Sequence, residues 1–242
     1  MKGVVLAGGL GRRLGPLTRI TNKHLLPVYD RPMIYYPIQT LVDAGIRDIM
    51  IVTGGNNAGD FLRLLGNGRE FGLKHINYTY QNGEGGIADA LSLAEHFADK
   101  QKIVVILGDN LLEKPIKKHV EKFSLQPQGA RILIKEVPDP ERFGVVEFQG
   151  KKITKISEKP RKPVTKYIVT GVYMYDSRVF DIIRTLKPSR RGEMEITDVN
   201  NTYLKRGQLY YDILEGFWTD CGLPETLYRA TTLARKKIKN KT

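Results

Sequence analysis

Apolar runs rich in β-branched residues alternate, along the first half of this chain, with segments of helical character. The runs are predicted strands at residues 3–7, 48–54, 75–81 and 102–110. The segments between them carry apolar residues at helical spacing, at residues 33–45, 57–68 and 86–99. Strands that alternate with helices are typical of a mainly parallel sheet covered by helices. The sequence therefore predicts an α/β fold with a doubly wound, mostly parallel sheet.

The second half of the chain changes to hairpin-like strands. A strand is predicted at residues 130–137 and a hairpin at residues 143–160. The remaining predicted elements are a strand at 167–176 and helices at 177–186, at 195–207 and from about Pro224. No internal repeat or low-complexity linker divides the sequence. We therefore expect one domain, residues 1–242, with a small inserted β element.

Directly after the first predicted strand, the chain carries four glycines and two adjacent arginines in the stretch VVLAGGLGRRLGPLT (residues 4–18). Glycine lets the backbone adopt positive φ and approach a ligand closely, and Arg12 and Arg13 add positive charge. The dinucleotide fingerprint G-x-G-x-x-G, begun at Gly9, would need glycine where Leu14 stands, and the Walker pattern is absent. The stretch is either a tight strand-to-helix connection or an anion-binding turn, and the paired arginines favour the anion-binding turn.

The net charge of the chain is +13, from 39 Lys and Arg against 26 Asp and Glu. Such an excess of positive charge is found in nucleic-acid-binding proteins. Here the cations lie in separate lysine-rich stretches, which are typical of solvated surface, and no RNA-recognition motif is evident. Nucleic-acid binding is therefore the distant alternative to an enzyme that attracts polyanionic small molecules.

The single cysteine, Cys221, excludes an internal disulfide framework and a cysteine-based zinc cluster. No apolar run approaches the roughly 18 residues of a membrane span. The chain leads straight into its first predicted strand with no signal peptide. We therefore expect a cytoplasmic protein with no membrane partner.

Two aspartates follow apolar stretches that lie far apart in the sequence. Asp109 follows IVVILG, and Asp220 lies in FWTDCG. A lone aspartate at a strand end is more often a cap than a metal ligand. Two aspartates facing one phosphate-rich site would instead suit Mg²⁺, which bridges one or two carboxylates to substrate phosphates. The four histidines are scattered, and no Ser-His-Asp or Cys-His arrangement is found.

Several short motifs follow one another along nearly the whole chain. They are LAGGLGRRLGPLT, NKHLLPVYDRPMIYYPI, GGIADA, LGDN, FGVVEF, SEKP, VTGVYMYD, RGEMEITDVN and WTDCG. This series, from Gly3 to about Leu227, resembles the sugar-1-phosphate nucleotidyltransferases. The resemblance implies a Rossmann-like α/β nucleotidyltransferase fold, Mg²⁺ as cofactor and a homo-oligomer. It is strongest to members that join dTTP to glucose 1-phosphate and release pyrophosphate, and enzymes that use UTP or another sugar phosphate are the nearest alternative.

The resemblance also implies roles for individual residues. The residues that match catalytic positions are Arg13, Lys23 and Lys159. Those that match the nucleotide site are Leu6, Gly8, Gly9, Gly11, Arg13, Gln81, Gly86 and Asp109. Those that match the sugar-phosphate site are Asn110, Gly144, Glu158, Lys159, Val169 and Thr170. The metal positions are matched by Asp109 and Asp220.

The chain departs from the family pattern in three places. Asp89 stands where relatives with GLAQA-type motifs carry glutamine, and Phe143 replaces the common tyrosine before Gly144. The chain also stops soon after its last predicted helix, where longer relatives have a helical segment associated with a regulatory nucleotide site. We therefore expect the nucleotide-sugar product to inhibit mainly at the active site.

Overall fold

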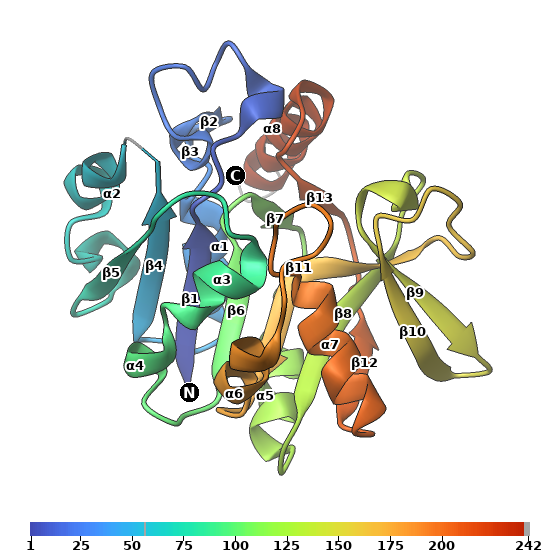
Figure 1. Cartoon of the computed structure of the whole chain (residues 1–242). Coiled ribbons are helices and arrows are strands. Elements are labelled where there is room, and N and C mark those ends of the chain that lie inside the picture. The colour runs from blue at the N-terminus through green and yellow to red at the C-terminus, as the bar shows by residue number, and fades with distance from the viewer. Residues whose placement is uncertain (56, 240–242) are drawn as a thin grey trace.

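The computed structural model describes residues 1–55 and 57–239, and these are centred on a nine-stranded sheet (Figure 1). The main path of the sheet runs in the order β10-β9-β11-β6-β1-β4-β5. Its parallel part comprises β1 (Lys2–Ala7), β4 (Ile49–Gly54), β5 (Ile76–Gln81) and β6 (Ile103–Leu107). All of these match strands predicted from the sequence. β1 and β4 are nearly continuous apolar runs because neighbouring strands and helices bury them on every side.

The rest of the sheet joins this parallel part through β11 (Tyr167–Tyr175), which is antiparallel to β6. β11 also pairs antiparallel with β8 (Ala130–Glu136) and with β9 (Gly144–Gln149). β9 and β10 (Lys152–Glu158) form the predicted hairpin, which projects from the body of the fold in Figure 1. The sequence did not predict β12 (Leu209–Ile213), which runs parallel to β8, because this short strand is half-buried or exposed throughout and is interrupted by Asp212.

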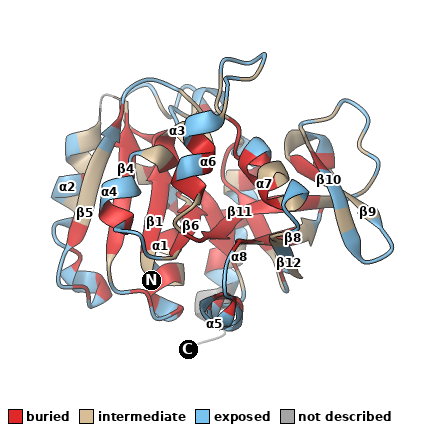
Figure 2. Ribbon diagram, turned by 60° about the horizontal axis from the view of Figure 1, so that its bottom comes forward, coloured by how far each residue is buried: buried red, intermediate tan, exposed pale blue. Residues whose placement is uncertain are grey.

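Helices cover both faces of the sheet, as the doubly wound prediction requires. One face packs against α1 (Tyr35–Asp43), α2 (Ala58–Leu65) and α5 (Lys117–Leu125). The other packs against α3 (Ile87–Ser92), α4 (Glu95–Ala98), α6 (Val179–Thr185) and α7 (Ile196–Lys205). Successive side chains of a strand face opposite sides, so Val5 belongs to the first core and Val4 to the second. Figure 2 shows the buried strands between helices whose outer sides are exposed.

A third apolar cluster anchors the opening turn beside the C-terminal helix. It joins Leu14 to Cys221 and to Ala230 of α8 (Pro224–Lys239). Short strand pairs lie close to this cluster, namely β2 (Pro27–Val28) with β3 (Arg31–Pro32) and β7 (Asn110–Leu112) with β13 (Trp218–Asp220). Because Leu14 is buried there, the turn that carries the two arginines is held against the body of the protein.

The structure departs from the predicted elements in three places. The predicted strand 102–110 ends at Leu107, and Asn110 already begins β7. The single helix predicted at 86–99 is divided into α3 and α4. The sequence analysis predicted no helix where α5 lies; the lysines of this stretch are exposed as expected, and the inner side of the helix buries Val120 and Phe123 against the sheet.

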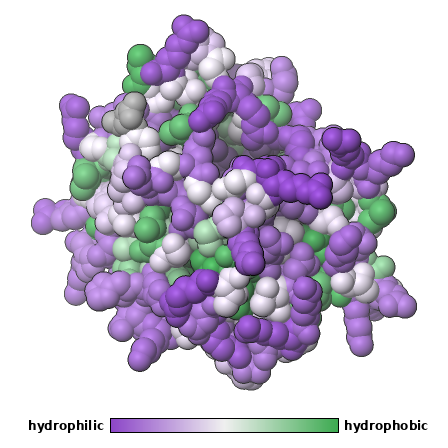
Figure 3. Space-filling view, viewed as in Figure 1, coloured by the Kyte–Doolittle hydropathy of each residue, from purple (hydrophilic) through white to green (hydrophobic). Residues whose placement is uncertain are grey.

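One face of the molecule is shown by hydropathy in Figure 3. Hydrophilic side chains cover most of the face seen in Figure 3, and apolar side chains are scattered among them. Within the described residues, no helix is both long enough and apolar enough to cross a membrane.

Candidate active site

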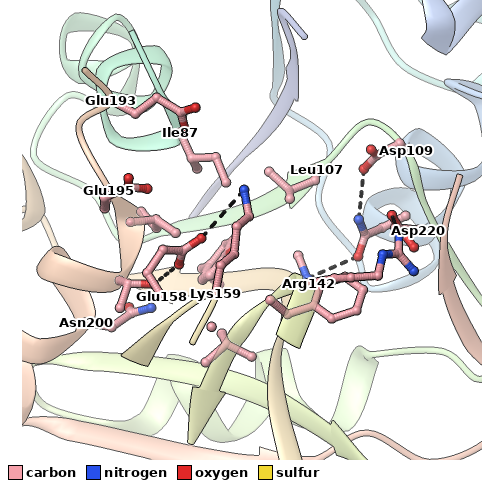
Figure 4. A pocket seen from close by; sticks show the side chains of 18 of the residues that line it. Ile87, Leu107, Asp109, Arg142, Glu158, Lys159, Glu193, Glu195, Asn200 and Asp220 are labelled. Carbon is pink, nitrogen blue, oxygen red and sulfur yellow. Dashed lines mark hydrogen bonds and ion pairs between the residues drawn. The ribbon is translucent and has the colours of Figure 1, made fainter. Parts of the chain in front are cut away.

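A cleft opens where β1 and β6 end and the chain passes into loops, the usual ligand position in an open α/β sheet. Two lobes of this cleft share Ile87, Leu107, Asp109 and Glu193. The first lobe is also lined by Leu6, Gly8, Gly9, Lys23, His24, Gln81, Glu84, Gly86 and Ala90. The second lobe, seen from close by in Figure 4, is also lined by residues that include Arg13, Asn110, Arg142, Gly144, Glu158, Lys159, Val169, Arg191, Glu195 and Asp220.

The opening turn needs glycine because neighbouring side chains lie very close to it. A Cβ at Gly8 would lie 2.5 Å from Gln81 Oε1, and a Cβ at Gly11 would lie 2.7 Å from the Cβ of Lys23. Gly11 also has a φ of +67°, which favours glycine. The turn is therefore folded tightly against Lys23 and Gln81, and its residues Gly8 and Gly9 line the first lobe.

Lys23 and Asp109 form an ion pair where the two lobes meet. Lys23 Nζ lies 2.5 Å from Asp109 Oδ2, and both side chains are largely buried. Burial acts to raise the pKa of Asp109, but the charge of Lys23 and hydrogen bonds to the carboxylate outweigh it and hold the pKa well below its usual range. Burial, followed by the charge of Lys23, lowers the pKa of His24 to about 3. At neutral pH the junction therefore holds a charged carboxylate and a neutral imidazole.

Asn110 links the two aspartates that the sequence keeps far apart. β7 and β13 pair antiparallel, which places Asp220 opposite Asn110. Asn110 Nδ2 donates to Asp109 Oδ1 at 3.0 Å. Its Oδ1 accepts from Trp218 Nε1 at 2.7 Å and from the backbone N–H of Gly171 at 3.1 Å. The pairing of two short strands thus brings both predicted metal residues to the same wall of the cleft.

Arg142 lines the cleft but was not among the residues predicted from the sequence. It ends a 3-10 turn, η4 (Pro140–Arg142), and donates to Asp220 Oδ2 and to Asp139 Oδ2, each at 2.7 Å. Burial and then the negative charge of Asp109 raise the pKa of Asp220, and the Arg142 charge opposes this shift. The one signal for Arg142 in the sequence is its place directly before the FGVVEF motif.

The paired carboxylates fit a hard divalent cation. The negative charge of Asp109 helps to raise the pKa of Asp220, which reports repulsion between like charges that a bound cation would relieve. Mg²⁺ prefers oxygen ligands and is usually bound by one or two carboxylates, with water and substrate phosphates completing its shell. Within residues 1–55 and 57–239, no group of three or more His, Cys, Asp or Glu side chains could hold a metal ion. Substrate oxygens would therefore have to complete a site at these two aspartates.

The second lobe contains a network of acidic and basic side chains around Glu158 (Figure 4). The Thr197 hydroxyl donates to Glu158, and Lys159 Nζ and Arg191 Nη2 lie 3.9 Å and 3.6 Å from Glu158 Oε1. Arg191 also pairs with Glu195 at 2.8 Å. Burial is the main cause that raises the pKa of Glu158. The network offers acceptors for hydroxyl groups and cations for a phosphate.

The structure places some predicted residues differently within the cleft. Thr170 is fully buried and its hydroxyl donates to the Leu133 carbonyl at 2.8 Å, so its side chain does not line the cleft, whereas Val169 does. Adjacent residues of a strand face opposite sides, so only one of the two can face a ligand. Arg13 lines the second lobe, where its charge acts to lower the pKa of Asp220.

Lys159 has a backbone conformation that is uncommon for a residue with a side chain. Its φ is +41°, and its N–H donates to the Phe143 carbonyl at 2.9 Å. Such strain occurs mainly at functional sites, where the surrounding structure enforces it. The conformation supports a functional role for the SEKP motif.

Residues 2–237 of the chain match the family model described as nucleotidyl transferase. The chain belongs to the nucleotidyl transferase family. Its curated relatives include enzymes named glucose-1-phosphate thymidylyltransferase. The one from Neisseria meningitidis is 44% identical over 97% of this chain and 83% of its own length. The one from Mycobacterium tuberculosis is 41% identical over 97% of this chain and 82% of its own length.

Solved structures of similar proteins share the fold over nearly the whole chain. A protein from Bacillus anthracis, assigned as a glucose-1-phosphate thymidylyltransferase and solved with sucrose, is 53% identical with a TM-score of 0.93. The alignment covers 97% of this chain and 95% of that one. A UDP-glucose pyrophosphorylase solved with UDP-glucose is 26% identical with a TM-score of 0.84, over 98% of both chains.

Proposed function

We propose that this protein transfers a deoxythymidylyl group from dTTP to glucose 1-phosphate, giving dTDP-glucose and pyrophosphate. The observation that carries the proposal is the two-lobed cleft, in which a glycine-rich turn with Lys23 and a polar network with Lys159 meet at Asp109. The names of the curated relatives support this choice of substrates.

The first lobe is proposed to hold the nucleotide. Gln81 and Gly86 line it at the end of β5 and the start of α3, and are the candidates for contact with the base. Gly8, Gly9 and Lys23 also line this lobe, with Lys23 paired to Asp109, and are the candidates for contact with the phosphates. The base would then lie against Gln81 and Gly86, and the phosphates would extend past Asp109 toward the wall of the second lobe that carries Arg13.

The second lobe is proposed to hold the sugar phosphate. Asn110, Gly144 and Val169 line it, and Glu158 offers carboxylate oxygens to sugar hydroxyls. Lys159 is the candidate for the phosphate of this substrate, because its ammonium group lies beside Glu158 in the same lobe.

The reaction needs no side-chain nucleophile and no general base. A phosphate monoester has a second pKa near 6, so an oxygen of the sugar phosphate is already anionic at neutral pH. This oxygen bonds to the α-phosphorus while the bond from that phosphorus to the pyrophosphate breaks, and the electron pair leaves with the pyrophosphate. The neutral His24 beside Asp109 agrees with a site that does not use histidine as a base.

The main obstacle is repulsion between two polyanions. A pair of unit charges ~4 Å apart interacts by roughly 4 kcal/mol at an effective dielectric of ~20. Arg13, Lys23 and Lys159 bring cations to the cleft from three separate segments, with Arg13 proposed to face the departing pyrophosphate. Mg²⁺ bound at Asp109 and Asp220 would add positive charge that binds phosphate oxygens. Catalysis is then mainly positioning and charge stabilisation.

A UTP-dependent reaction is the second candidate, because the fold also matches a UDP-glucose pyrophosphorylase with a TM-score of 0.84. The 26% identity of that protein is well below the 41–44% of the relatives named for thymidylyl transfer. We therefore rank dTTP first. We also infer a cytoplasmic homo-oligomer with no nucleic-acid or membrane partner.

A pyrophosphate-release assay tests the proposal. The purified protein with Mg²⁺ is combined with each of dTTP, UTP, dCTP and dATP and with each of several sugar 1-phosphates. We expect the highest kcat/KM with dTTP and glucose 1-phosphate. Release of pyrophosphate with none of these pairs would contradict the proposed function, and a higher kcat/KM with UTP would favour the second candidate.

A further inference from the structure

Asp89 holds the side chain of Gln81 in one orientation. Gln81 is buried at the carboxyl end of β5 and lines the first lobe. Its Nε2 donates to Asp89 Oδ2 at 2.7 Å and to the Gly86 carbonyl at 3.2 Å. A carboxylate and a carbonyl only accept hydrogen bonds. The amide nitrogen must therefore face Asp89 and Gly86, and the reversed amide would set oxygen against oxygen.

The amide oxygen of Gln81 is left facing the opening turn. A Cβ at Gly8 would lie 2.5 Å from Oε1, and both residues line the first lobe. Within the described part of the chain, both hydrogen bonds of the Gln81 side chain use its nitrogen and none uses its oxygen. The lobe is thus presented with a hydrogen-bond acceptor at a fixed position.

The carboxylate of Asp89 has little freedom to turn away. It belongs to the first turn of α3 and lies against Gly85, where an added Cβ would collide with it. The segment is tied to the loop before α7 by two backbone bonds: Met194 N–H donates to the Gly85 carbonyl at 2.8 Å, and Ala88 N–H donates to the Met194 carbonyl at 3.1 Å. Asp89 and Gln81 are therefore held together by both side-chain and backbone contacts.

We propose that Asp89 is a positioning residue for base specificity, which fixes Gln81 so that the first lobe takes a pyrimidine with an N–H at N3 and refuses cytosine. This inference rests on the proposed function of the first lobe as the nucleotide site. Thymine and uracil donate from N3 and can bond to Gln81 Oε1. Cytosine carries a lone pair at N3, so two acceptors would face each other without a bond, and such a mismatch is strongly discriminated at a buried site.

Calorimetric binding of dTTP, dUTP and dCTP with Mg²⁺ tests the inference, alongside turnover with glucose 1-phosphate. We expect dTTP and dUTP to bind the wild-type protein within about tenfold of each other and dCTP to bind about 100-fold more weakly than dTTP. Asp89→Asn introduces a side chain that can donate to a reversed Gln81 amide, so that only the longer bond to the Gly86 carbonyl, at 3.2 Å, still favours the original orientation. The preference for dTTP over dCTP should then shrink by about tenfold.

The matched control is Asp43→Asn. Asp43 accepts from Gln39 Nε2 at 2.7 Å on the exposed side of α1, so it has the same kind of bond outside the cleft. This variant should keep the full preference. If Asp89→Asn does not fold, as judged by circular dichroism, Asp89→Ser replaces it, with the same expected loss of preference.

The outcomes separate the inference from the proposed function. A wild-type protein that binds none of the three nucleotides contradicts the proposed function itself. A wild-type protein that prefers dTTP, together with a folded Asp89 variant that keeps the whole preference, overturns the role of Asp89 and leaves the function standing. If the wild-type protein turns over dTTP but binds dTTP and dCTP equally, the proposed role of Asp89 in base specificity is also overturned.

Discussion

Arg142 lies between two carboxylates, with Nη2 2.7 Å from Asp220 Oδ2 and Nη1 2.7 Å from Asp139 Oδ2. Its side chain is mostly buried, and the turn that carries it leads directly into β9 of the hairpin. One of the two proposed cation ligands is therefore held by the segment that also forms a wall of the sugar lobe.

We expect Arg142→Ala to lower turnover by about 10- to 100-fold, because Asp220 stays buried without the partner that positions it. Arg142→Lys should recover little, since lysine cannot form the two-pronged contact of a guanidinium. Steady-state kinetics with dTTP and glucose 1-phosphate at saturating Mg²⁺ measures both. Asp139→Asn removes only the outer contact and should be much milder, so equal losses in Arg142→Ala and Asp139→Asn would assign the effect to folding of the turn.

Asp109→Asn and Asp220→Asn should each lower turnover by roughly 100-fold or more, the ~3 kcal/mol scale of one lost electrostatic contact. Each removes a charge that a hard cation prefers, so the Mg²⁺ concentration for half-maximal rate should also rise. The double variant should cost much less than the sum of the two, because both residues act on one ion. If either single variant keeps normal turnover and normal Mg²⁺ dependence, that aspartate is a structural cap and not a metal ligand.

Arg13→Ala should reduce turnover far more than it weakens sugar-phosphate binding, because its proposed partner is the leaving pyrophosphate. Arg12→Ala is the matched control. Arg12 is exposed and pairs with Glu84 at 2.6 Å at the rim of the first lobe, and exposed ion pairs contribute little. Kinetics and glucose 1-phosphate titrations of both variants test this, and a larger effect at Arg12 would reverse the assignment of the two arginines.

Asp212→Asn should destabilise the protein at neutral pH by about 2 kcal/mol, because Asp212 accepts from Arg131 at 2.7 Å and from Lys122 at 2.9 Å. Burial acts to raise the pKa of Asp212, but these hydrogen bonds and charges outweigh it and lower the pKa from its ordinary value of 3.8. As the pH falls, Asp212 is therefore protonated in the unfolded chain before it is protonated in the folded protein. The stability that its contacts with Arg131 and Lys122 contribute is present above about pH 4 and is lost as the pH falls below it.

Urea unfolding at pH 7 and at pH 3 measures this difference. The gap in free energy of unfolding between wild type and Asp212→Asn should narrow at pH 3. Glu215→Gln is the control, because Glu215 pairs with Lys118 on the exposed surface and should contribute little at either pH. A gap that stays the same at both pH values would show that the charge of Asp212 does not contribute.

Local patterns in the residues were enough to predict most helices and strands. Strands such as β1 and β4 are continuous apolar runs because they are buried on both faces, and helices such as α1 and α7 carry apolar residues at helical spacing. The order of the motifs was enough to identify the family. The glycines of the opening turn could also be singled out from the sequence, although the contacts that require them are seen only in the structure.

The contacts between residues far apart in the chain became visible only in the folded protein. The approach of Asp109 to Asp220 depends on the pairing of β7 with β13, three residues each, and strands that short carry no recognisable pattern. β12 was missed because it is short, partly exposed and interrupted by Asp212. The contacts of Arg142 and Asp89 depend on side-chain direction and on partners elsewhere in the chain. Such long-range contacts follow from how packed elements are placed in space, which local residue preferences do not specify.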